Sequence, residues 1–179
     1  MKYNFMFGEL VKQDVLQGLR TEEGFIVSTD RNPADIQLRQ RGFYASGFVG
    51  KLFTLSDAEP RSGLLVNLGV GLLQHKIRIQ DDPQRVVPQL SSEYKKGYDR
   101  LTNGLTIHQF IGYQYLSQNQ RINFSIGVEA IEGFTQNRRD WNFDTRSRET
   151  DNRLDMLLGI QANWIIPIYF NRQAEEIIY

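Results

Sequence analysis

Two histidines are the residues in this chain best suited to acid–base chemistry. His75 and His108 are the only imidazoles among 179 residues, and the chain contains no cysteine. Thiolate zinc sites, cysteine nucleophiles and any metal site built on three histidines are therefore excluded. No Gly-x-Ser-x-Gly nucleophile elbow is present. We expect no catalytic residue, no metal and no cofactor. An acyl-transfer or protease type of enzyme, using His75 or His108 with a neighbouring acid, stays open as an alternative.

Glu129 is the most informative charge, because it stands within a strictly alternating apolar segment. A carboxylate placed away from water needs a partner. The sequence therefore predicts a polar network inside the fold, made of Glu129, His108, Asn163, Gln161 and Lys51. An ion or proton pathway through the same residues is the functional alternative.

The elements that must position these residues are long strands. Apolar residues alternate with a period of two over residues 40–53, 63–80, 102–116, 122–136 and 154–170, and over a shorter stretch, 2–7. The five long segments greatly exceed a common strand of about five or six residues. No window approaches the roughly 20 apolar residues of a membrane-spanning helix.

The alternation also predicts how two strands pair. If Leu116 pairs with Arg121 around a four-residue turn, Tyr113 faces Phe124 on the apolar side. His108 then lies opposite Glu129 on the other side. A slip of one residue would move Phe124 to the wrong face.

One face of these strands is bulky and apolar, and the other mixes glycine, amides and charge. Repeated glycine suits a narrow, packed lumen better than a solvent face. Aromatic residues gather near strand ends, which is typical of membrane-barrel girdles; they are Tyr113, Tyr115, Phe124, Trp164, Tyr169 and Phe170. Short connections (54–62, 117–121) alternate with long ones. The fold class predicted is all-β, an antiparallel up-and-down transmembrane β-barrel surrounded by outer-membrane lipids. A soluble lipocalin-like lipid-binding barrel, with apolar residues inward, is the alternative.

Six visible strands are fewer than the usual minimum of eight for such barrels. The start of the chain also lacks the pattern of a signal peptide. We expect about eight strands in the intact protein, with an N-terminal hairpin and export signal missing here. Residues 1–170 would form the barrel domain, and 171–179 a periplasmic C-terminal tail.

Two segments outside the strands could contact other molecules. The connection 138–153 combines Arg138 and Arg139 with Trp141 and Phe143, which predicts an outer-loop interaction site for lipopolysaccharide phosphates or a protein. A self-paired, solvated hairpin tip is the alternative. The tail ends in apolar side chains that could dock on the sheet edge of a periplasmic partner, or could simply fray; they are Ile177, Ile178 and Tyr179.

The charge balance limits the partners further. Lys plus Arg and Asp plus Glu each total 21, so the formal charge is zero. Nucleic-acid binders concentrate positive charge on one face. We therefore expect no nucleic-acid partner.

Several short motifs carry a resemblance to a known family. They are GYDRLTNG at 97–104, QFIGY at 109–113, EGFTQ at 132–136, two arginines at 138–139, FD at 143–144 and WIIPIY at 164–169. In combination the chain resembles small outer-membrane barrels of the Bacteroidota, of the PorG-like and PorT-like kind associated with type IX secretion and gliding. The resemblance implies a non-enzymatic outer-membrane anchor or accessory component. It also implies a periplasmic lipoprotein or ring component of the secretion machine as partner.

Overall fold

The strands of the computed structural model follow the alternating segments of the sequence closely. The structure describes residues 1–9, 11–56, 61–117 and 122–167. The main sheet contains β1 (Lys2–Gly8), β4 (Gln37–Thr54), β5 (Gly63–Gln80), β6 (Thr102–Leu116), β7 (Asn123–Asn137) and β8 (Asn152–Trp164). A separate small hairpin is formed by β2 (Ile26–Val27) and β3 (Pro33–Ala34). Short 3-10 turns η1 (Gln17–Leu19), η2 (Pro88–Leu90) and η3 (Tyr94–Gly97) lie in the long connections.

All six strands of the main sheet are antiparallel to their neighbours, in the order β1-β4-β5-β6-β7-β8. The prediction of an all-β, antiparallel, up-and-down fold is therefore confirmed. Within the described residues β1 and β8 form the two edges and do not pair with each other, so the sheet is open. No described helix is long and apolar enough to cross a membrane.

The strand limits agree with the prediction except at the end of the chain. Strand β8 ends at Trp164, although the backbone amide of Ile165 still donates to the Asn123 carbonyl at 2.8 Å. Tyr169 and Phe170, counted among the end aromatics, lie outside the described residues, and so does the whole tail 171–179.

The predicted pairing of β6 with β7 is wrong by two residues. Leu116 pairs with Asn123 rather than Arg121, so Tyr113 faces Ile126, and Glu129 faces Phe110 instead of His108. The connection closes where the Ser117 amide donates to the Ile122 carbonyl at 3.1 Å. A shift of two residues returns every side chain to its own face. The alternation therefore predicts the faces correctly and cannot detect this slip.

Each strand has one apolar face and one mixed face. The outer face consists of the odd-numbered residues of β1, β4 and β6 and the even-numbered residues of β5, β7 and β8; the remaining residues form the inner face. On the outer face, the side chains of Val70, Leu105 and Ile160 are exposed. On the inner face, those of Thr106, His108 and Ser125 are buried, although no second sheet packs on them.

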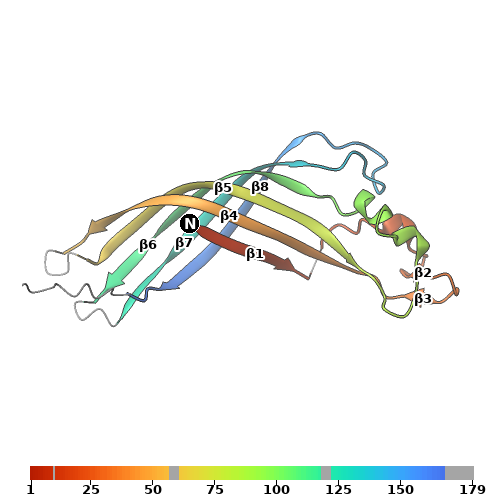
Figure 1. The fold of residues 1–179 in the computed structure, drawn as a ribbon, viewed down its shortest axis with the longest axis horizontal. Coiled ribbons are helices and arrows are strands. Elements are labelled where there is room, and N and C mark those ends of the chain that lie inside the picture. Colours follow the sequence, from red (N-terminus) through yellow and green to blue (C-terminus); the bar gives the residue numbers. More distant parts are fainter. Residues whose placement is uncertain (10, 57–60, 118–121, 168–179) are drawn as a thin grey trace, which may run out of the picture.

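The sheet is strongly curved and twisted, and the inner face lies on its concave side (Figure 1). Strands β1 and β8 are five neighbours apart, which would be about 24 Å in a flat sheet. Yet Lys2 of β1 donates a hydrogen bond to Gln161 of β8 at 3.0 Å. A lysine side chain can reach that amide only if the two edges approach each other, which explains how the inner face is buried.

A glycine pair makes room for an aromatic ring inside this curl. Gly112 and Gly127 are direct partners across β6 and β7. A Cβ atom built on either glycine would lie 2.7 or 2.8 Å from Cζ of Phe110, too close for any real contact. The ring of Phe110, itself buried, therefore occupies the space that side chains at these positions would need.

The three long connections gather at one end of the sheet and pack against one another (Figure 1). The connections after β1 and after β5, together with the end of β5, share an apolar core that we call the loop cap; it contains Val15, Leu16, Ile26, Ala34, Ile36, Ile79, Val87 and Leu90. Backbone bonds join the connections, for example from Thr29 to the Val86 carbonyl at 3.0 Å. The long connections thus pack together at this end of the sheet instead of extending separately into solvent.

Candidate functional site: a polar network on the inner face

Glu129 lies at the centre of a network that spans the curled sheet, which we call the Glu129 network. Lys2 of β1 donates from Nζ to Oε2 of Glu129. Nε2 of His108, on β6, lies 3.2 Å from the same oxygen. The side chains of all three are largely buried. The carboxylate therefore has a full positive charge as its partner, as a buried acid requires.

The network continues along β8 through side-chain amides. Gln161 accepts from Lys2 and donates to Oδ1 of Asn163 at 2.9 Å. Asn163 then donates to the hydroxyl of Ser125 at 3.0 Å. Four predicted residues, Glu129, His108, Gln161 and Asn163, are thus brought together, with Lys2 and Ser125 added.

Lys51 does not belong to this network, and its inclusion in the prediction is wrong. It pairs with Val66 on the outer face, and its ammonium lies 5.2 Å from the ring centroid of Phe53. The segment around it contains three glycines (Gly42, Gly47, Gly50), so its alternation is weak and the sequence did not show which parity points inward.

Lys2 was missed although the sequence held a signal for it. Tyr3, Phe5 and Phe7 alternate in β1, which puts Lys2 on the opposite, polar side. What the sequence could not show is that β1 lies across from β7 and β8, because that contact depends on the curl of the whole sheet.

Aromatic rings fix the imidazole of His108 in place. The ring centroids of Phe48 and Tyr44 lie 5.8 Å and 6.2 Å from it. Nδ1 of His108 is buried and has no hydrogen-bond partner in the described residues. The imidazole is thus packed as part of the interior and is directed at Glu129 alone.

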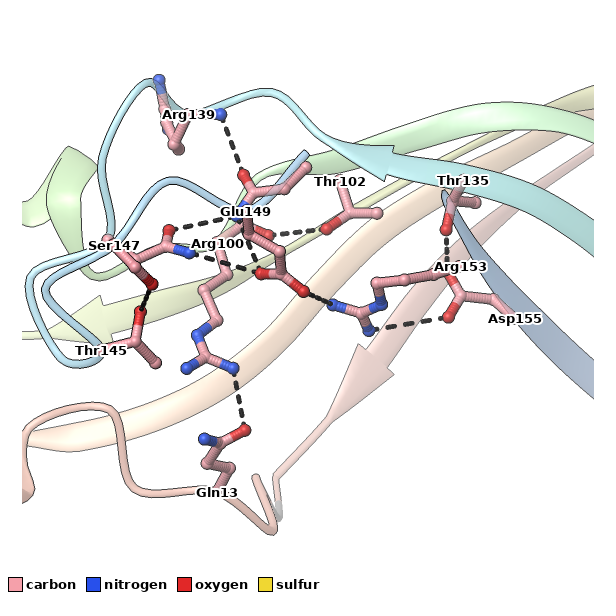
Figure 2. A network of polar contacts seen from close by, with 12 residues as sticks. Gln13, Arg100, Thr102, Thr135, Arg139, Thr145, Ser147, Glu149, Arg153 and Asp155 are labelled. Atoms are coloured by element: carbon pink, nitrogen blue, oxygen red, sulfur yellow. Dashed lines mark hydrogen bonds and ion pairs between the residues drawn. The ribbon is translucent and has the colours of Figure 1, made fainter. Parts of the chain in front are cut away.

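A second polar cluster lies on the inner face next to the loop cap (Figure 2). Nε2 of His75 lies 2.9 Å from Oδ2 of Asp155, which also accepts from the hydroxyl of Thr135 at 2.6 Å. The guanidinium of Arg153 lies 3.7 Å from carboxylate oxygens of both Asp155 and Glu149. We call this the rim cluster. It draws on β5, β7 and β8 and on the connection before β8.

An apolar layer separates the Glu129 network from the rim cluster. Tyr44, Leu73 and Ile131 are buried together, with Met6 and Leu157 packed against them. Ile131 stands between Glu129 and Thr135 along β7, and Leu157 stands between Gln161 and Asp155 along β8. Such a layer interrupts a continuous polar route, which disfavours the ion or proton pathway.

Both histidines are paired with an acid, but the recorded hydrogen bonds of each imidazole go only to that carboxylate. Within the described part of the chain neither imidazole is hydrogen-bonded to a hydroxyl group, the contact by which a base activates a nucleophile for acyl transfer. Among the described residues no group of three or more potential metal ligands occurs. The geometry therefore favours structural polar networks.

The predicted outer-loop residues have different surroundings. Arg139 forms a double hydrogen bond with Asp99, at 2.7 and 2.5 Å, and this contact raises the pKa of Arg139 above its ordinary value. Arg138 donates to Asn103 at 2.6 Å. Trp141 is 49% exposed. The two arginines thus tie this connection to the segment 99–103 instead of pairing within it, and Trp141 is left exposed.

Phe143 is a structural contact as well as a surface residue. Its amide donates to the Gly97 carbonyl at 2.9 Å, and its ring packs edge-on against Tyr98 with centroids 5.3 Å apart. A Cβ atom on Gly97 would lie 2.3 Å from this ring. Phe143 therefore holds the connection 138–151 onto η3.

The predicted docking residues Ile177, Ile178 and Tyr179 lie outside the described residues. No protein-family model, curated protein or solved structure matches this chain.

Proposed function

We propose that this chain forms most of the wall of a small β-barrel in the outer membrane of a Gram-negative, Bacteroidota-like cell. The observation that carries the proposal is the outer face. Ile126, Val128, Leu158 and Ile160 are 49, 56, 73 and 81% exposed, whereas Glu129 and Asn163 lie inside the curl. Water-soluble monomers rarely expose contiguous apolar patches beyond a few hundred Å². Lipid chains are the surroundings that such a face suits.

Strand length supports the same proposal. A tilted strand crosses the hydrocarbon core with about 9–11 residues, and β8, the shortest of the five long strands, has 13. Aromatic side chains on the outer face gather towards the short connections; Tyr115 and Phe124 have centroids 5.6 Å apart, and Trp164 pairs with Phe124. This is the position of an interfacial girdle.

The open edges support an intact barrel with additional strands. Six strands are fewer than the smallest usual membrane barrel, which has eight. Unpaired edges in lipid leave backbone amides and carbonyls without partners, at several kcal/mol each. We infer that about two further strands close the gap between β1 and β8. A longer chain should then give a heat-modifiable band on electrophoresis; if the present 179 residues alone give that band, this inference is wrong.

We infer further that the barrel is a non-enzymatic anchor or accessory part of a type IX secretion or gliding machine. This rests on the family resemblance of the motifs. In the fold those motif residues bind one another: Asp99 pairs with Arg139, Arg100 pairs with Asp144, and Gly97 contacts Phe143. The motif residues thus hold the connection 138–151 to the segment 97–100, which fits a scaffold better than an enzyme.

The partner proposed is a periplasmic lipoprotein or ring component that contacts the short connections and the tail. The test is crosslinking from the tail in native envelopes, followed by purification. Recovery of a periplasmic lipoprotein, lost when residues 171–179 are deleted while the barrel still assembles, supports the anchor. Recovery of assembly chaperones alone contradicts it.

Two alternatives make distinct predictions. A soluble lipid-carrying barrel needs its apolar residues on the inner face, which here carries Glu129, His108 and Asp155; its purification from the soluble fraction without detergent would favour it. An enzyme needs His75 or His108, so alanine at both would abolish activity in an assembled barrel. The anchor predicts that secretion survives the double substitution.

A further inference from the structure

A cavity of about 350 Å³ opens where the inner face meets the loop cap. Its walls come from the connection after β1, from β4 and β5, from the end of the connection before β6 with the first residue of β6, and from the start of β8. Among the described residues its lining includes Lys12, Lys76, Arg100 and Arg153 and contains no Asp or Glu. Lys76 belongs to the outer face of β5, so its side chain is not one of the proposed ligand-binding groups. The volume is within the range of about 300–1,000 Å³ for small-ligand sites.

Of the positively charged groups around this cavity, Arg153 and Lys12 have N–H donors to spare, and Arg100 is held by its own partners. Arg153 lies 3.7 Å from its nearest carboxylate oxygens, beyond hydrogen-bond distance. Arg100 donates to Gln13 at 2.8 Å and pairs with Asp144, while its Nε is buried without a partner. Lys12 lines the cavity from an exposed turn, and the described residues give its ammonium no ion pair. Figure 2 shows Arg100 directed at Gln13, and Arg153 between Glu149 and Asp155.

Acidic groups stand behind the arginines rather than in the cavity. Asp144 holds Arg100, and Glu149 and Asp155 lie on either side of Arg153. The hydrogen bond from Arg100 to Asp144 fixes the direction of that guanidinium, whereas the longer ion pairs keep Arg153 at the cavity and leave its N–H groups for a ligand. Lys12 adds a charge without a matching acid. The arrangement presents fixed N–H donors to an anion.

The backbone at Arg100 is held in an unusual conformation. Its φ of 45° lies in the left-handed region, which is unfavourable for a residue with a side chain. The conformation is held because Thr102 donates to the Arg100 carbonyl at 3.0 Å and the Leu101 amide donates to Asp99 at 3.3 Å. The fold thus maintains a strained residue whose side chain lines the cavity.

We propose that this cavity binds a phosphate group carried on a small ligand of sugar size. A ligand with one carboxylate has too few oxygens and too little charge to use two guanidinium groups and one ammonium. A phosphate group offers several acceptor oxygens and up to two negative charges. The space left over fits the body that carries the phosphate. The ligand could be a soluble sugar phosphate or the phosphorylated sugar of an envelope lipid.

The test is titration calorimetry on the whole protein in detergent micelles, with glucose 1-phosphate, inorganic phosphate and lipid A as probes. We expect saturable binding that Arg153→Gln and Lys12→Gln each weaken about tenfold, because each substitution removes one charged donor from the phosphate. Arg78→Gln is the matched control, since Arg78 is an exposed arginine on the outer face of β5. Lys12 lies in an exposed turn, so its variant keeps the test independent of folding.

Binding of glucose 1-phosphate identifies a soluble ligand, and binding of lipid A alone identifies a lipid headgroup; either supports the proposal. Absence of saturable binding for all three probes overturns it, and so does an equal loss in Arg78→Gln. Binding depends on the cavity alone, so it would persist in a protein whose secretion role had been disproved.

Discussion

At the residue scale, the molecule is organised by one buried carboxylate and the cation that reaches it. Glu129 could be identified from the sequence because it interrupts an apolar alternation, and His108, Gln161 and Asn163 share its face. The lysine assigned to it was Lys51, whereas Lys2 makes the contact. Parity within a strand is visible in sequence; proximity across a curled sheet is not.

Lys2→Met should destabilise the protein by about 3 kcal/mol, because it leaves the Glu129 carboxylate inside without its cation. Lys2→Met combined with Glu129→Gln should recover most of the loss. Urea unfolding in detergent micelles measures both. Lys51→Met is the control, since Lys51 lies on the outer face. Equal effects of Lys2→Met and Lys51→Met would refute the network.

Gly127→Val should cost about 1–3 kcal/mol, because the new side chain meets the Ile111 carbonyl and Cα of Gly112 across the sheet as well as the ring of Phe110. Gly47→Val is the matched control, because nothing lies within 4 Å of a Cβ built there. Unfolding midpoints of the two variants test the packing. A tolerated Gly127→Val would mean that the inner face is wider than the structure has it.

At the element scale, the strands were predictable and the connections were not. The period of two gave five long strands to within about three residues, apart from the end of β8. The register of β6 and β7 was missed because a slip of two preserves both faces. The loop cap was missed because its core joins residues from two connections and from β5 that are far apart in sequence, a pattern without periodicity.

Acid should loosen the loop cap through Asp82. Backbone amides of Gln84 and Asp35 donate to its carboxylate at 2.8 and 3.2 Å, and these bonds lower the pKa of Asp82 below its ordinary value of 3.8. Because the pKa of Asp82 is lower in the folded state than in the unfolded state, the ionised carboxylate stabilises the fold at pH values above 3.8. This stabilisation is lost as the pH falls through the lowered pKa of the folded state.

Limited proteolysis of the connection after β5 measures this loosening. We expect cleavage to increase as pH falls below about 4 in the wild type, whereas Asp82→Asn should be cleaved more at neutral pH and should respond less to acid. Pepsin is used for digestion at acidic pH, and a protease of broad specificity for digestion at neutral pH. An unchanged pattern in Asp82→Asn at both pH values would contradict the role given to this carboxylate.

At the scale of the whole molecule, the account depends on what surrounds the outer face. The sequence predicted two chemically different faces, and the strand register confirms that they exist. Closure into a barrel, the secretion role and the tail's docking residues stay predictions, because they depend on segments and partners other than the six strands of the main sheet.

The most direct test is spin labelling of single cysteines along β8, which the absence of native cysteine makes straightforward. Labels would replace residues 154 to 161 in turn, and collisions with oxygen and with a water-soluble nickel chelate would be measured in outer-membrane lipid vesicles. The account predicts high oxygen accessibility at even positions, including Leu158 and Ile160, and low accessibility to both reagents at odd positions. High accessibility of the even positions to the nickel chelate would contradict it.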